Sequence, residues 1–113
     1  MSLKKTTKKT SKPFKVLNFT GRYDGFTDFY DLNKTEIYKS ILEIFTEFNQ
    51  STTKTLSLHI QAKIKGLDWD TEFTFNRDET IILTRDVMPY FEKMEDYETC
   101  QEIKILHEDL TNS

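Results

Sequence analysis

The sequence is poor in the residues that usually mark a chemical site. Its one cysteine, Cys100, excludes a disulfide within the chain and a zinc site built from several cysteines. Its two histidines, His59 and His107, have no second ligand at metal-binding spacing. Its three glycines are too scattered to form a glycine-rich phosphate loop. The sequence therefore predicts no cofactor and no metal site, and Cys100 is expected to be a half-buried structural thiol.

Long apolar runs are also absent. The longest extend over only a few residues, whereas roughly 18 are needed to cross a bilayer. The lysine-rich start lacks the apolar segment and small-residue cleavage site of a secretory signal. A lone thiol fits a reducing compartment. We therefore expect a cytoplasmic protein that does not bind membranes.

Acidic and basic side chains are segregated along the chain. Residues 1–12 contain five lysines and no acid, while the remainder holds 11 basic and 19 acidic side chains. Residues 86–109 alone carry eight acids and two lysines. Because residues 1–12 have no apolar periodicity with which to offset their ordering entropy, they are predicted to be a disordered basic tail. The acidic remainder would repel phosphates, so nucleic acid is not the expected partner.

The length of 113 residues suits one domain, predicted over 13–110 and followed by a polar end at 111–113. Aromatic residues make up 13% of the chain, so they must supply much of the core. Alanine occurs once, whereas lysine, isoleucine, threonine, phenylalanine and asparagine abound. This bias is typical of AT-rich genomes, such as those of low-GC bacteria, their phages and mobile elements.

A hairpin and a helix are predicted in the first half of the chain. Asp24-Gly25 is a strong signal for a two-residue hairpin turn, so residues 14–23 are expected to fold back on the segment that follows. A helix is predicted over 34–49, because Asn33 is a suitable N-cap and apolar residues recur at helical spacing after it.

The central segment shows the clearest strand pattern. Apolar and polar residues alternate over 55–64 and again over 67–75. A two-residue turn at Lys65-Gly66 sets small residues against large ones on the apolar face and opposite charges across from each other on the polar face. On the polar face this register pairs Lys63 with Asp68, Gln61 with Asp70 and His59 with Glu72.

The last third of the chain is predicted to add a strand at 80–84 and a helix over roughly 86–98. From Gln101 the pattern fits a final edge strand or a continued helix, of which the strand is favoured. Together these elements predict an α+β fold of order ββαβββα, with a possible last strand. We expect two layers, in which two helices pack on one face of an antiparallel sheet of five or six strands.

Three carboxylates on the polar face are the main candidates for chemistry. Asp68, Asp70 and Glu72 occupy alternate positions, about 7 Å apart in succession, so neighbouring pairs can share a Mg²⁺ ion with phosphate oxygens. The element order is similar in outline to the core of the PD-(D/E)xK nucleases, but residues 80–84 read Thr-Ile-Ile-Leu-Thr where that family has an acid, one residue and a lysine. A Mg²⁺-dependent phosphoesterase or nuclease is the alternative function.

Aromatic residues gather most densely between residues 19 and 30. Successive side chains of a hairpin point to opposite faces, so these rings are not all expected to be buried. An exposed patch of Arg22, Tyr23, Phe26 and Tyr30 has the composition of a protein-binding hot spot. The sequence therefore favours a small non-enzymatic accessory protein that binds a protein partner, or a second copy of itself, through this patch. Mimicry of nucleic acid by the acidic residues 86–109 is a compatible mechanism.

Overall fold

Seven elements of secondary structure lie in the part of the chain that the computed structural model describes, residues 13–112. In chain order they are β2 (Lys15–Asn18), α1 (Phe26–Gln50), β3 (Thr55–Ile64), β4 (Leu67–Asn76), the π-helical segment η2 (Leu83–Val87), α2 (Met88–Lys93) and α3 (Tyr97–Thr111). The predicted disordered tail, residues 1–12, and the last residue of the predicted polar end lie outside the described residues.

The strands form one mixed sheet in the order β2-β3-β4. β2 runs parallel to β3, with Leu17 beside Ile60, and β4 runs antiparallel to β3. A parallel pair needs a crossover between its strands, and α1 supplies it. The α+β class is confirmed. The predicted antiparallel sheet of five or six strands with two helices is wrong, because residues 13–112 form three strands in a mixed sheet and three α-helices.

The predicted hairpin of β3 and β4 is confirmed in its register. Ile64 lies opposite Leu67 and Ala62 opposite Trp69, and the pairing continues without interruption to Thr55. Lys65 and Gly66 both have positive φ angles, 55° and 78°, as a two-residue turn of this twist requires. The hairpin is predictable because its turn and its alternation are local in sequence.

The predicted hairpin turn at Asp24-Gly25 is wrong, because the chain enters a helix there. The Asp24 N–H donates to Asp28 Oδ2 at 3.1 Å, and the Phe29 N–H donates to the Gly25 carbonyl at 3.0 Å. α1 therefore begins at Phe26, well before residue 34. An acid in the first turn that accepts from the preceding N–H stabilises a helix start, and this signal outweighs the turn preference of the Asp-Gly pair.

The early start of α1 also changes the role of Asn33. It lies inside the helix, and its side-chain amide donates to the Phe29 carbonyl at 2.8 Å instead of capping a helix end. Phe29 and Ile37, on either side of Asn33, are both buried, so the buried stripe of α1 continues through the predicted boundary.

Residues 80–84 do not form the predicted strand but lead into η2 and α2. Leu83, Val87 and Phe91 recur every four residues and are all buried. A helix gathers these three side chains on one face, whereas a strand would leave them without a common partner layer. Burial therefore overrides the strand preference of the β-branched residues that precede them.

The predicted helix over roughly 86–98 is correct only up to Lys93, and the strand favoured after it is wrong. α2 ends at Lys93 and α3 begins at Tyr97, so the chain turns inside the predicted helix. From Gln101 the chain is helical, because Ile103, Leu106 and Leu110 fall on one face of α3 and are buried there. The alternation of Ile103 and Ile105 misleads, since Ile105 points to solvent.

Side chains bond to the free backbone groups at the start of α3 and at the end of α1. Asp96 is the N-cap of α3: its carboxylate accepts from the Thr99 N–H at 3.2 Å and from the Thr99 hydroxyl at 2.7 Å, which lowers the pKa of Asp96 below its usual value. At the end of α1, Arg77 Nη1 donates to the carbonyls of Phe48 and Ser51, the latter at 2.8 Å. α1 has no basic residue in its last turn, so Arg77 supplies the positive charge that a helix C-terminus favours.

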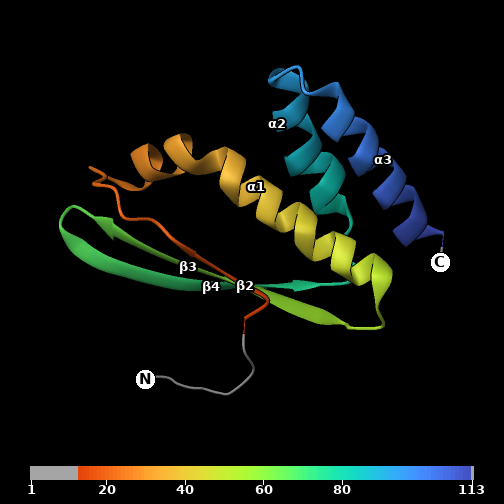
Figure 1. The fold of residues 1–113 in the computed structure, drawn as a ribbon, viewed down its shortest axis with the longest axis horizontal. Coiled ribbons are helices and arrows are strands. Elements are labelled where there is room, and N and C mark those ends of the chain that lie inside the picture. The colour runs from red at the N-terminus through yellow and green to blue at the C-terminus, as the bar shows by residue number, and fades with distance from the viewer. Residues whose placement is uncertain (1–12, 113) are drawn as a thin grey trace.

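The molecule is built in three layers (Figure 1). The sheet forms one side, α1 crosses it, and α2 and α3 pack against the side of α1 that faces away from the sheet. α1 is therefore buried from two directions, through the fully buried side chains of Ile44, Phe45 and Phe48. Among the described residues, no helix has both the length and the apolar character needed to span a membrane.

Candidate functional site

The inner face of the sheet, which carries the apolar side chains and faces α1, is covered unevenly. On β3 every inner-face residue from Leu58 to Ile64 is buried beneath α1. On β4, at the edge of the sheet, none of the inner-face residues is buried, and Leu67 and Phe73 are 72% and 45% exposed. Because α2 and α3 pack on α1 and not on the sheet, no further layer formed by residues 13–112 covers β4.

The uncovered part of the inner face forms a groove between the first half of α1 and β4. Its volume is about 380 Å³, and apolar side chains dominate its lining. The Phe26 and Trp69 rings meet edge to face with centroids 4.8 Å apart, and Phe29 lies beneath Trp69 at 5.7 Å. We call this feature the aromatic groove, and its main lining residues are Phe26, Phe29, Tyr30, Ile37, Trp69 and Phe73.

The four residues of the predicted hot spot have different places in the structure. Phe26 and Tyr30 line the aromatic groove and are 54% and 39% exposed. The Tyr23 ring packs edge to face on the groove residue Phe29, with ring centroids 5.1 Å apart. Arg22 is exposed and makes no hydrogen bond or ion pair with any described residue. The hairpin expected to carry them does not exist, so they share the start of α1 and the segment before it.

Two groove residues were missing from the sequence prediction, Trp69 and Phe73. The alternation puts both on the apolar face of the central hairpin, and the predicted fold covers that face with two helices. The signal that separates them from the buried residues opposite is their place on an edge strand. Sheet order depends on the parallel pairing of β2 with β3, which the sequence pattern does not reveal.

A tyrosine network fixes one wall of the aromatic groove. The hydroxyls of Tyr30 and Tyr38 are hydrogen bonded, and the Tyr38 ring packs on Tyr90 of α2 with centroids 5.2 Å apart. Burial, followed by the hydrogen bond to Tyr30, raises the pKa of Tyr38. Lys34 Nζ lies 5.2 Å from the centroid of the Tyr30 ring. Tyr30 is thus held in place while its ring stays partly exposed.

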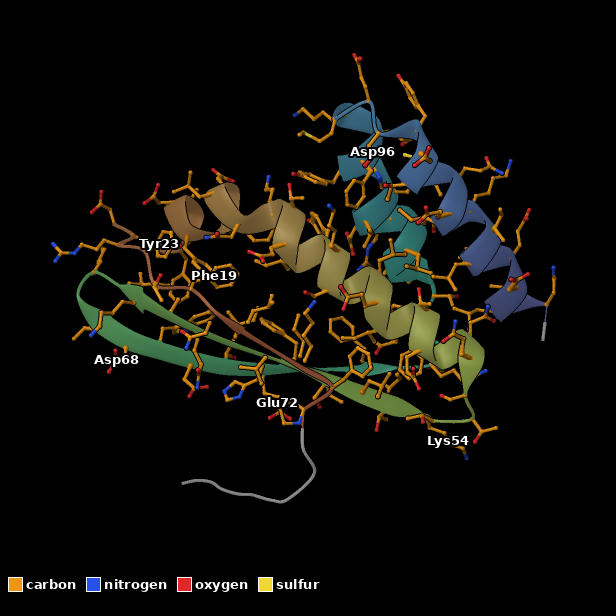
Figure 2. The ribbon with its side chains drawn as sticks, in the orientation of Figure 1. Phe19, Tyr23, Lys54, Asp68, Glu72 and Asp96 are labelled. Carbon is orange, nitrogen blue, oxygen red and sulfur yellow. The ribbon has the colours of Figure 1, made fainter. Side chains whose placement is uncertain are left out.

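The outer face of the sheet is polar and open (Figure 2). Asp68 and Glu72 point away from α1, in line with the predicted alternation. Lys63 Nζ lies 3.2 Å from Asp68, and His59 contacts Asp70, its diagonal neighbour, although it stands opposite Glu72 in the register. In residues 13–112 no three or more His, Cys, Asp or Glu side chains are grouped closely enough to hold a metal ion. These carboxylates therefore gain no support as a magnesium site.

Comparisons of the chain with protein-family models, with curated proteins and with solved structures gave no match. A function for this chain is therefore inferred from its own residues and their arrangement.

Proposed function

We propose that this chain is a non-enzymatic binding protein that holds another protein in the aromatic groove. The observation that supports the proposal is the exposure of Phe26, Tyr30 and Phe73 around one apolar depression. Large aromatic rings cost free energy in water, and they dominate the binding energy of protein interfaces because each buries much apolar area. A contiguous aromatic patch on a small domain is therefore typical of an interface.

The surroundings of the aromatic groove also suit an interface. The two walls come from different elements, α1 and β4, and each is anchored to the core, Tyr30 by its hydroxyl bond to Tyr38 and Trp69 by its contacts with Phe26 and Phe29. A preformed site loses little conformational entropy when it binds. Arg22 lies just before α1, and it is free to pair with an acidic group of a partner at the rim.

Site-specific photo-cross-linking in the cells that naturally make the chain tests this proposal. The photoreactive residue p-benzoylphenylalanine replaces Phe73 in one variant and Ile105 in the control, an apolar residue of α3 that is 49% exposed and distant from the groove. We expect a cross-linked polypeptide from position 73 and not from 105, and we expect Phe26→Ser to reduce its yield at least about tenfold, since buried aromatic anchors are worth 2 kcal/mol or more.

Two results would contradict the proposal. One is the absence of any cross-link from position 73, and the other is an equal yield from both positions. Phe26→Ser must keep the circular dichroism spectrum of the parent chain. Tyr30→Ser serves as a second groove variant if it does not.

A further inference from the structure

β4 has no partner strand along its outer edge among residues 13–112. The carbonyls of Ser57 and Gln61 on β3 accept from the N–H groups of Phe14 and Phe19, so odd-numbered residues of β3 point their backbone groups toward β2. Even-numbered residues therefore point toward β4, as the bond from the Arg77 N–H to the Lys54 carbonyl shows just beyond the strand ends.

The register between β3 and β4 shows which backbone N–H and C=O groups of β4 point away from β3. Leu58 and Ile60 stand opposite Phe73 and Thr71, so the odd-numbered residues of β4 bond to β3. Asn76, at the end of the strand, bonds to Glu79 through both its N–H and its carbonyl. The other even-numbered residues present their N–H and C=O groups at the outer edge, where nothing in residues 13–112 pairs with them. These residues are Asp68, Asp70, Glu72 and Thr74.

This edge has few of the features that protect exposed strands. β4 is ten residues long, it contains no proline, glycine or lysine, and its pairing with β3 shows no bulge. Its acidic side chains are the one protection it has. Three of the four residues with free backbone groups are acids, and their side chains all lie on the outer face.

The acids oppose pairing of β4 with a second copy of the chain. In antiparallel pairing, residues with outward backbone groups face each other across the new ladder. The two registers with the greatest overlap set Asp70 against Glu72 of the second copy, or two Glu72 side chains against each other. Like charges directly opposite are destabilising in a sheet, so the edge disfavours itself and favours a basic partner.

Residues 1–12 also do not have the composition to cover both the outer edge of β4 and the aromatic groove. Residues 1–12 are basic, but they offer Leu3 as the one internal apolar side chain, and they join the domain next to β2, at the opposite edge of the sheet. They can supply charge to the outer face but not a row of apolar side chains to the aromatic groove.

We propose that the edge of β4 takes up an extended segment of a partner protein in which basic and apolar side chains alternate. This inference rests on the proposed function and names the chemistry of the partner. The segment adds a fourth strand about 4.8 Å beyond β4. Its basic side chains lie beside Asp70 and Glu72 on the outer face, and its apolar side chains lie on the inner face against Phe73 and Tyr30. Glu72 makes no ion pair within the described residues, so its charge is available.

Titration of the full ¹⁵N-labelled chain with two synthetic peptides tests the inference. The first is acetyl-KVKFKVKV-amide, and the second is acetyl-EVEFEVEV-amide, which has the same alternation and the opposite charge. We expect the basic peptide to bind with a dissociation constant below about 1 mM and the acidic one not to bind. Binding should slow hydrogen exchange at the amides of Asp70, Glu72 and Thr74, because these gain hydrogen bonds.

A matched pair of variants separates charge from fold. Glu72→Gln removes one charge at the edge and should weaken binding of the basic peptide two- to fivefold, as expected for an exposed ion pair. Glu102→Gln makes the same change on the exposed side of α3 and should leave binding unchanged. Added salt should weaken binding in the parent chain more than in the Glu72→Gln variant.

Several results would overturn the inference. Equal binding of both peptides, or no binding of the basic peptide, would overturn the inference about the edge of β4. If position 73 still cross-links to a partner in that case, the proposed function stands without this inference. A dimer in sedimentation equilibrium with protected Asp70 and Glu72 amides would assign the edge to a second copy. Faster exchange of these amides after deletion of residues 1–12 would assign the edge to the chain's own start.

Discussion

At the scale of single residues, Arg77 shows how one side chain can stabilise an element to which it does not belong. It follows β4, yet its guanidinium reaches the end of α1 and bonds to the Ser51 carbonyl at 2.8 Å, with Phe48 and Thr53 carbonyls also in reach. A helix end leaves carbonyls without internal partners, and a cation there is doubly favourable. Arg77 therefore joins α1 to the end of the hairpin.

Replacing Arg77 with alanine should lower the free energy of unfolding by about 1–3 kcal/mol, the usual worth of hydrogen bonds to a charged group. Urea denaturation followed by circular dichroism measures the change. Lys54→Ala is the matched control, because it removes a neighbouring exposed cation and should shift stability by less than about 0.5 kcal/mol. Equal effects of the two substitutions would show that Arg77 acts only through net charge.

At the scale of elements, the hairpin was predictable and the order of the sheet was not. The alternation of β3 and β4 and the turn at Lys65-Gly66 are local, so the sequence specifies their register to the residue. The pairing of β2 with β3 joins segments on either side of a 25-residue helix. No local pattern encodes that pairing. The sequence instead predicts additional strands at 80–84 and after Gln101, where the chain is helical.

The difference between local patterns and long-range pairing also explains which residues of the candidate site could be predicted. Phe26 and Tyr30 belong to the densest aromatic cluster of the sequence, so they could be named as candidates although the predicted hairpin is wrong. Trp69 and Phe73 became recognisable only when their strand proved to lie at an edge, beyond the cover of α1. A residue's type reveals its capacity to bind, whereas its exposure depends on how distant elements are layered.

The free edge of β4 predicts alternating amide exchange along the strand. The amides of Trp69, Thr71 and Phe73 bond to β3 and should exchange at least about 100-fold more slowly than those of Asp70 and Glu72, which face solvent. A series of ¹⁵N correlation spectra after transfer into D₂O measures these rates. Uniform protection along β4 would show that another strand already covers the edge in solution.

At the scale of the whole molecule, α1 connects two layers that otherwise have little contact. Its Phe45 packs toward Phe75 of the sheet, with ring centroids 6.2 Å apart, while α3 and η2 lie against its other side. Loss of packing on the α3 side should therefore be transmitted to the sheet through α1. One cooperative unfolding transition is expected for the domain.

Ile103→Ala should lower the free energy of unfolding by about 2–5 kcal/mol, because Ile103 is fully buried between α3 and the layer beneath it. Fluorescence of Trp69, the one tryptophan, reports on the sheet, and circular dichroism at 222 nm reports on the helices. Both should move to the same lower denaturant midpoint. Ile105→Ala, on the exposed side of α3, should move neither by more than a small amount. A Trp69 transition that stays in place would mean that the layers unfold separately.

The parallel pairing of β2 with β3 has a consequence for the order in which the chain acquires its structure during synthesis. β2 and α1 leave the ribosome first, but the strand that Lys15 to Asn18 must join is translated only after the whole of α1. Until Leu58 and its neighbours leave the ribosome, Ile44 and Phe48 have no sheet against which to pack. The β3–β4 hairpin is thus the template on which the nascent segment condenses, and release of a chain stopped before Asn76 should yield an aggregation-prone fragment.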